Sequence, residues 1–223
     1  MNLNLTGKRA LVTGGTRGIG LAIAQELYAE GCTVAVCARK AASIRGCKVI
    51  TANCDIPDDR VRVIRETMAA LGGLDILVNN VGGMGRVECT PGAVEEWQAI
   101  MNRNAWAAAH FTMMTLQYMR EHHWGRVVTI ASVYGKEAGG TPWFNMAKAA
   151  EIAFMKNLAL SAQPDITFNS VCPGPIRVGN PLEAGRMGKP EDVAHLVAFL
   201  CSDKARWVNG ACITVDGGES RSF

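Results

Sequence analysis

Seven short runs rich in Val and Ile alternate along this chain with longer segments in which apolar residues recur at helical spacing. The runs cover residues 9–13, 33–38, 48–52, 75–79, 125–131, 165–171 and 211–215. Between them, apolar residues four positions apart, such as Ile19, Ile23 and Leu27, indicate amphipathic helices. This alternation predicts an α/β fold with a doubly wound, mostly parallel seven-stranded sheet and helices on both faces.

No change in composition and no internal repeat divides the 223 residues, so we expect a single domain over residues 1–223. The longest predicted helices cover residues 102–120 and 145–161. Both carry small and apolar residues on more than one face, which is typical of helices that are deeply buried or lie at a subunit interface. The connection at residues 179–186 is short, which predicts an open substrate pocket on that side.

Charge and composition exclude several classes of function. A formal net charge of +3, without a long run of Lys or Arg, disfavours nucleic-acid binding. The first residues lack the apolar core of a signal peptide, and no stretch of about 18 apolar residues offers a membrane span. The eight cysteines form no Cys-x-x-Cys pair and have no His at ligand spacing. We therefore expect a cytoplasmic protein with reduced, buried cysteines and no metal site.

A glycine-rich segment follows the first predicted strand and precedes the first predicted helix. Its sequence, residues 13–20, is TGGTRGIG, with glycines at 14, 18 and 20. Glycines allow a tight turn and close approach to a phosphate, while the N-terminus of the helix offers unpaired N–H groups and the positive end of its dipole. An ordinary strand-to-helix turn is the alternative. The strand–loop–helix context near the N-terminus favours binding of a dinucleotide pyrophosphate.

The spacing Gly-x-x-x-Gly-x-Gly resembles that of the short-chain dehydrogenase/reductases, and further motifs resemble this family in the same order. They are Asn79-Asn80-Val81-Gly82, Asn104, Ser132, Lys148 within Asn-Met-Ala-Lys-Ala-Ala, Pro173-Gly174 and Val215-Asp216-Gly217-Gly218. The similarity spans the chain through about Gly218. It implies a Rossmann fold that binds a nicotinamide dinucleotide.

The choice of dinucleotide depends on the end of the second strand. NAD-preferring members of the family carry an acidic residue there that binds the ribose hydroxyls, whereas this chain has Cys37-Ala38-Arg39. Arg39 and Arg17 could pair with a 2′-phosphate, which favours NADP(H). Alternatively, both arginines are solvated surface charges and NAD(H) is bound. The cofactor-binding residues implied by the resemblance are Gly14, Thr16, Arg17, Gly18, Ile19, Gly20, Arg39, Asp55, Asn80, Gly82, Lys148, Pro173, Gly174 and Ile176.

The catalytic residues implied by the resemblance are Asn104, Ser132, Lys148 and a Tyr four positions before the Lys. In the family the Tyr is the general acid/base, and the Lys lowers the pKa of its phenol and binds the nicotinamide ribose. Ser132 would hold the substrate oxygen, and Asn104 would support a water that relays protons. Position 144, however, is Phe. The persistence of Ser132, Asn104 and Lys148 favours an engineered Tyr-to-Phe substitution at Phe144, and a natural loss of the acid is the alternative.

The predicted function is that of an NADP(H)-dependent oxidoreductase that interconverts a small ketone and a secondary alcohol, disabled at Phe144. The alternative is a natural non-catalytic protein that binds the dinucleotide as a regulator. A β-ketoacyl substrate and a sugar, cyclitol or other secondary metabolite remain equal candidates. The resemblance also implies a homotetramer or homodimer through the two long helices. There Trp106, Phe111, Met113 and Met114 either supply an interface or pack against the sheet.

Overall fold

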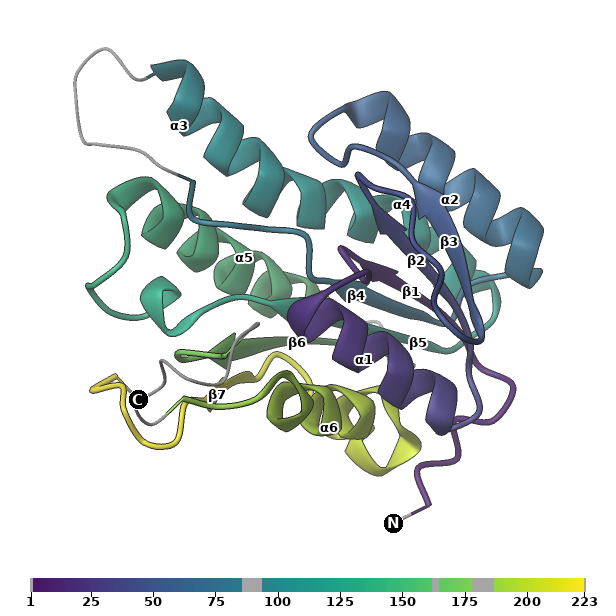
Figure 1. The fold of residues 1–223 in the computed structure, drawn as a ribbon. Helices are drawn as coiled ribbons and strands as arrows, with labels where there is room; N and C mark the ends of the chain where they lie inside the picture. The colour runs from purple at the N-terminus through teal and green to yellow at the C-terminus, as the bar shows by residue number, and fades with distance from the viewer. Residues whose placement is uncertain (1, 86–93, 162–164, 178–186, 223) are drawn as a thin grey trace.

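The computed structural model describes residues 2–85, 94–161, 165–177 and 187–222. Its centre is a parallel sheet in the order β3-β2-β1-β4-β5-β6-β7 (Figure 1). The strands are β1 (Arg9–Thr13), β2 (Thr33–Ala38), β3 (Cys47–Thr51), β4 (Ile76–Asn79), β5 (Gly125–Ile130), β6 (Ile166–Pro173) and β7 (Cys212–Val215). This confirms the predicted seven-stranded Rossmann fold. The strand order reverses between β1 and β4, which in such sheets opens a crevice for a ligand.

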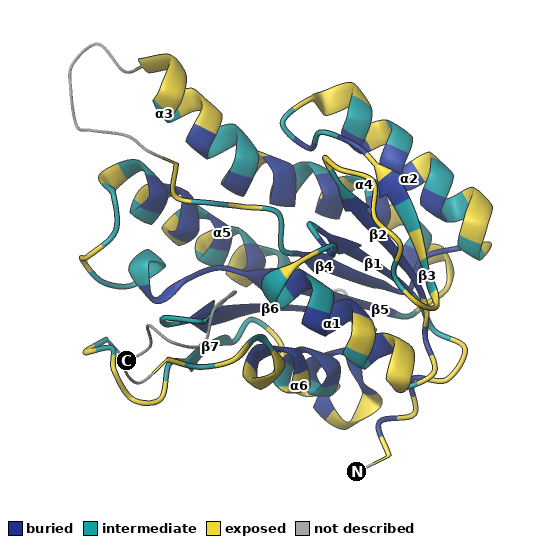
Figure 2. Ribbon diagram, in the orientation of Figure 1, coloured by how far each residue is buried: buried dark blue, intermediate teal, exposed yellow. Residues whose placement is uncertain are grey.

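Helices cover both faces of the sheet, as predicted (Figure 1). On one face lie α1 (Gly18–Ala29) and α6 (Pro190–Cys201), and on the other α2 (Pro57–Leu71), α4 (Ala107–Glu121) and α5 (Pro142–Leu160). Successive strand residues point to opposite faces. In β1, Val12 therefore joins the cluster of α1 and α6, while Leu11 joins the cluster of the other three helices. The sheet is accordingly buried on both sides (Figure 2).

The limits of β1 and β2 match the prediction, and the other strands shift by one or two residues. The helix predicted over 102–120 begins earlier. It starts with α3 (Val94–Met101) and continues through a π-helical turn, η1 (Asn102–Trp106), into α4. The helix predicted over 145–161 also begins earlier, at Pro142, because proline fits the first turn of a helix, where its missing N–H is not needed.

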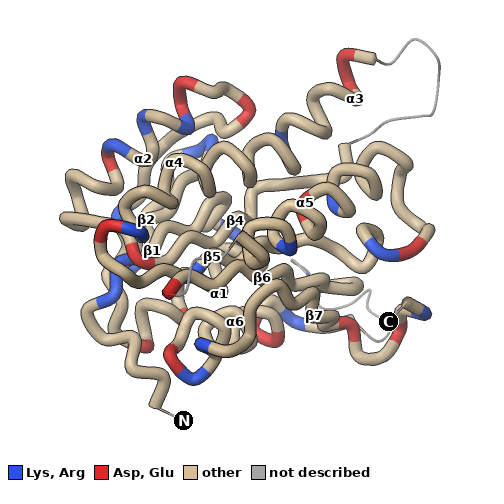
Figure 3. Tube along the Cα trace, turned by 180° about the vertical axis from the view of Figure 1, so that it is seen from behind, with Lys and Arg blue, Asp and Glu red and all other residues tan. Residues whose placement is uncertain are grey.

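Charges of both signs lie interspersed along the chain (Figure 3). On α2, Arg62 pairs with Asp59 at 2.8 Å and with Glu66 at 2.9 Å. Exposed pairs of this kind contribute little to stability, so they mark a solvated helix face. Within the described ranges, no helix is both long enough and apolar enough to cross a membrane.

One of the four interface candidates on the long helix belongs to the core. Phe111 is 1% exposed and packs with Leu77, Met155 and Phe168 between α4 and the sheet. Met113, two residues further on, is 55% exposed. Of the two roles left open for these residues, Phe111 therefore packs against the sheet, whereas Met113 points away from it, because nearby apolar positions on one helix face different sides.

We expect Phe111→Ala to lower the free energy of unfolding by about 3–5 kcal/mol, since it removes a buried ring and leaves a cavity. The matched control, Val61→Ala, alters an apolar residue of α2 that is 50% exposed and lies outside the helices proposed for the subunit interface, and should change the free energy of unfolding by no more than about 0.5 kcal/mol. Urea unfolding followed by circular dichroism measures both. Equal losses in the two variants would contradict the assignment of Phe111 to the core.

Candidate active site

The glycine-rich segment forms the loop between β1 and α1. Gly14 and Gly18 have φ values of +66° and +55°, in the left-handed region that favours glycine. A Cβ on Gly20 would collide with the Gly14 carbonyl and the Asn80 amide. Glycine at these positions therefore allows the loop to turn tightly and to pass close to Asn80 before α1 begins. The first N–H groups of a helix have no partners within it, so this end of α1 is suited to an anion.

Asn80 ties this loop to the neighbouring strand. Its Nδ2 donates to the carbonyl oxygens of Thr13, at 2.9 Å, and Gly14, at 3.2 Å. In return, Thr13 Oγ1 accepts from the backbone N–H groups of Asn80, at 2.9 Å, and Val81, at 3.0 Å. The ends of β1 and β4 are thus held together at the reversal of strand order. Asn80, predicted to bind cofactor, lines the site and also fixes the shape of the loop.

A cavity of about 770 Å³ opens beside this loop. Many of the predicted cofactor residues line it, namely Gly14, Thr16, Arg17, Gly18, Ile19, Gly20, Arg39, Asp55, Asn80 and Gly82. Its volume lies within the range of about 300–1,000 Å³ that is usual for cofactor and ligand sites. The glycine cradle and the open helix N-terminus fit a dinucleotide, so the residues present suit the cofactor that the sequence implies.

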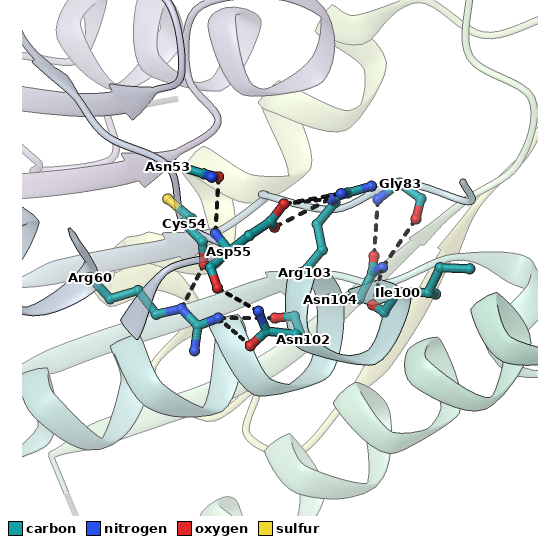
Figure 4. Close-up of polar contacts among 9 residues, drawn as sticks. All are labelled: Asn53, Cys54, Asp55, Arg60, Gly83, Ile100, Asn102, Arg103 and Asn104. Atoms are coloured by element: carbon teal, nitrogen blue, oxygen red, sulfur yellow. Dashed lines mark hydrogen bonds and ion pairs between the residues drawn. The ribbon is translucent and has the colours of Figure 1, made fainter. Parts of the chain in front are cut away.

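Positive charge dominates the wall of this cavity. Arg17 is exposed at the start of α1, and Arg39 and Lys40 are exposed directly after β2. Asp55 is the acidic residue among the described lining residues, and Arg103 neutralises it with an Nη2–Oδ2 distance of 3.0 Å (Figure 4). Sequence reasoning missed Lys40 and Arg103. Arg103 lies 48 positions from its partner and follows no motif, so the sequence carried no signal for it.

The π-helical turn η1 places Asn104 under the loop that follows β4 (Figure 4). Asn104 is fully buried, and its Nδ2 donates to the carbonyl oxygens of Ile100, at 2.8 Å, and Gly83, at 3.1 Å. Its Oδ1 accepts from the Gly83 N–H at 3.0 Å. Asn104 therefore holds the loop in place. π-Helical turns of this kind recur at functional sites.

Two of the catalytic candidates, Asn104 and Lys148, meet at Gly82. A Cβ on Gly82 would lie 2.6 Å from Asn104 Oδ1 and 3.1 Å from Lys148 Nζ, so both side chains reach this point. Lys148 Nζ lies 5.6 Å from the centroid of the buried Phe144 ring, one helical turn earlier in α5. Ser132 directly precedes the short helix η2 (Val133–Gly135), and its Oγ accepts from the Tyr134 N–H at 3.2 Å.

Lys148 has a partner that sequence reasoning missed. Its Nζ donates to the Ile130 carbonyl at 2.9 Å and lies 3.0 and 3.2 Å from the two carboxylate oxygens of Glu151. Glu151 is 2% exposed. Burial raises the pKa of the Glu151 carboxyl above its ordinary value, while the charge and hydrogen bond of Lys148 act in the opposite direction. The i,i+3 spacing of Lys and Glu was the available signal for this pair.

Four predicted cofactor residues do not line the cavity beside the glycine loop: Lys148, described above, and Pro173, Gly174 and Ile176. Pro173 ends β6, and the Gly174 N–H donates to the Val215 carbonyl at 3.0 Å. Ile176 forms a bridge with Gly188. Pro173, Gly174 and Ile176 thus lie at or after the end of β6, which pairs with β5. Ser132 lies just after the end of β5. The segment 179–186, for which an open pocket was predicted, lies outside the described residues.

A second, apolar cavity of about 430 Å³ lies between the α3–η1 helix and the start of α5. The rings of Trp97 and Trp143 stack in its wall with centroids 4.2 Å apart. Trp143 directly precedes Phe144 in the chain. Trp106, also in its wall, is 63% exposed. In the described ranges, no cluster of three His, Cys, Asp or Glu side chains could hold a metal ion.

Comparison with known proteins supplies the family. A family model described as short chain dehydrogenase matches residues 8–184. The acetoacetyl-CoA reductase of Shinella zoogloeoides is 32% identical over 234 residues, covering 94% of this chain and 97% of that protein. The 3-oxoacyl-acyl-carrier-protein reductase FabG of Escherichia coli (strain K12) is 35% identical over 243 residues, with 97% and 98% covered.

Solved structures agree with this assignment. The ligand-free aldohexose dehydrogenase of Thermoplasma acidophilum superimposes with a TM-score of 0.90 at 28% identity, covering 97% of this chain and 95% of that one. A short-chain dehydrogenase/reductase of Serratia marcescens BCRC 10948 gives a TM-score of 0.86 at 30% identity, with 96% and 98% covered. The chain belongs to the short-chain dehydrogenase/reductase family of oxidoreductases.

Proposed function

We propose that this protein binds NADP(H) in a site arranged for hydride transfer between a ketone and a secondary alcohol, and that Phe144 leaves this site without its general acid. The observation that carries the cofactor assignment is the cationic wall of the cavity. Arg17, Arg39 and Lys40 line it near the end of β2, and Asp55 is neutralised by Arg103. A wall of this charge suits a 2′-phosphate, which a free carboxylate would repel.

The residues that would hold NADP(H) follow the cavity and the sheet edge. The glycine loop would bind the pyrophosphate, Arg17 and Arg39 the 2′-phosphate, and Asp55 the adenine. Lys148 would bind the nicotinamide ribose, and Pro173, Gly174 and Ile176 would line the nicotinamide side. NADP(H), when bound, supplies or accepts the hydride.

The chain's own residues would handle the substrate oxygen. Ser132 Oγ can donate a hydrogen bond to it, but a serine hydroxyl is a poor source of protons. Phe144 occupies the position from which the resemblance implies a phenolic proton, and its ring has none to give. Ser132 would therefore stabilise negative charge on the substrate oxygen by a hydrogen bond, but position 144 would supply no proton to neutralise it.

Several finer assignments belong to the same proposal. The substrate would be a small carbonyl compound or alcohol. Among the similar proteins, reductases named for acetoacetyl-CoA and 3-oxoacyl substrates favour a β-ketoacyl compound, whereas the aldohexose dehydrogenase favours a sugar. The protein would be cytoplasmic. Trp106 and Met113 expose apolar surface on the long helix, which supports a homotetramer or homodimer.

The alternative is a non-catalytic protein that binds the dinucleotide for regulation. It is favoured by the same missing hydroxyl at Phe144. The two functions predict the same affinity for the cofactor and differ only in what happens when the hydroxyl is supplied.

The protein should bind NADPH more tightly than NADH, and Arg39→Ala should weaken NADPH binding by about tenfold or more. A charge-assisted hydrogen bond typically contributes about 1.5–3 kcal/mol, and 1.4 kcal/mol corresponds to tenfold in affinity. The affinity for NADH should change little. Arg45→Ala is the matched control, since Arg45 is also exposed after β2 but does not line the cavity. Isothermal titration calorimetry measures the affinity of the parent and of both variants for each cofactor. Equal affinities of the parent for both cofactors would remove the case for NADP(H).

The protein as it stands should show little turnover while it binds NADPH, and Phe144→Tyr should raise the rate by about 10²–10⁴-fold, the usual contribution of general acid–base catalysis. Tyr and Phe fill nearly the same volume, so the fold should be retained. The rate is followed by NADPH absorbance across a panel of β-ketoacyl thioesters, sugars and simple ketones. A variant that binds NADPH but reduces nothing across the panel would support the non-catalytic alternative. A parent that is already as active as the variant would show that Phe144 does not occupy the acid's position.

A further inference from the structure

The buried pair of Lys148 and Glu151 changes what Lys148 can do in the proposed site. The ammonium has three N–H donors, of which one is directed to Ile130 O and at least one to the Glu151 carboxylate. Both carboxylate oxygens lie within 3.2 Å of Nζ, and this contact favours the ionised carboxylate against the burial that raises the pKa of Glu151. At most one donor is then left for any other partner.

The charges of the pair act together because both groups are out of water. Lys148 and Glu151 are 4% and 2% exposed, so salt screens their interaction only weakly. An ammonium 5.6 Å from the ring at position 144 would by itself attract a phenolate there. The Glu151 carboxylate lies 3.0 Å from the same Nζ, and its charge of opposite sign opposes that attraction.

We propose that Glu151 is a positioning residue of this site, which fixes Lys148 as a hydrogen-bond donor and balances its charge, so that Lys148 does not act as an unpaired cation toward position 144. This inference rests on the proposed function, because it concerns the same lysine and the same missing hydroxyl. It adds that supplying the hydroxyl alone does not recreate an acid tuned by a neighbouring cation.

Several other titratable groups lie on the elements that pack against α5. They are Glu95 and Glu96 of α3, Arg103 of η1, His110, Tyr118, Arg120 and Glu121 of α4, Arg126 of β5, Tyr134 of η2 and Cys172 of β6. Arg103 pairs with Asp55, and Arg126 with Asp203. Burial, and then Arg60, lower the pKa of His110, which favours its neutral form. Cys172 Sγ lies 3.3 Å from Cys212 Sγ. Lys148 thus remains the charged group that contacts Glu151.

The direct test is the ionisation of a phenol placed at position 144. Phe144→Tyr is prepared alone and together with Glu151→Gln, which keeps a hydrogen-bond acceptor but removes the charge. Phenolate formation is followed by ultraviolet absorbance against pH, and the spectra of matching proteins with Phe at 144 are subtracted to remove the natural tyrosines. We expect Glu151→Gln to move the phenol's midpoint down by about one pH unit or more, since an unpaired opposite charge at 4–6 Å lowers a pKa by about one to three units.

A second variant covers the case in which Glu151→Gln fails to fold, because it leaves an uncompensated charge in the interior. In Phe144→Tyr with Lys148→Met and Glu151→Leu, both charges are replaced by apolar side chains of similar size. If the pair is close to neutral toward position 144, the phenol in this variant titrates near that of Phe144→Tyr alone. Phe144→Tyr with Glu96→Gln controls for the loss of a distant, exposed carboxylate, and should leave the midpoint unchanged.

Two results would overturn the proposal. One is that Glu151→Gln leaves the titration midpoint of the phenol at position 144 unchanged. The other is that replacing Lys148 by Met and Glu151 by Leu raises this midpoint by about one pH unit or more, which would show that the charge of Lys148 is not balanced by Glu151. The titration requires no turnover, so its result does not depend on whether the proposed function is correct. If Phe144→Tyr is inactive but the midpoints move as expected, the role of Glu151 stands and the proposal that the hydroxyl at position 144 restores turnover fails.

Discussion

The hydrogen bonds between Asn80 and the end of β1 fix the relative positions of the loops that form the cavity of the candidate site. They join two strands that are distant in sequence at the point where the strand order reverses, and they fix the glycine loop in a shape that only glycine at position 20 permits. The open N-terminus of α1, the exposed arginines and the neutralised Asp55 all face the cavity that this arrangement leaves. Asn104 extends the same support to the loop after β4. The cofactor pocket is therefore a consequence of how β1 and β4 end.

The opposite end of the site is organised by a buried charge pair. In the mechanism implied by the family resemblance, the lysine tunes a phenol through its positive charge. Here Glu151 takes up that charge, and Phe144 supplies no phenol. If Glu151 balances the charge of Lys148 as we propose, the site departs from that mechanism in electrostatics as well as in one hydroxyl.

Much of the fold could be predicted because Val- and Ile-rich runs bounded by Gly and polar residues mark buried parallel strands. The glycine loop followed in the same way from its strand–loop–helix context. The π-helical turn at Asn102 could not be predicted, since a change in hydrogen-bonding register leaves the apolar spacing almost unaltered. The pairing of Arg103 with Asp55 depends on how distant elements meet. Glu151 was overlooked because its i,i+3 spacing from Lys148 is also common for pairs on exposed helix faces, and only the structure shows that this face is buried.

A crystal structure of the complex with NADP⁺ tests the account most directly, because it examines both ends of the site at once. The account predicts that the 2′-phosphate contacts Arg17 and Arg39, and that Lys148 keeps its contact with Glu151 while its remaining donor reaches the nicotinamide ribose. A 2′-phosphate that points away from both arginines, or a Lys148 that leaves Glu151 when the cofactor binds, would contradict it.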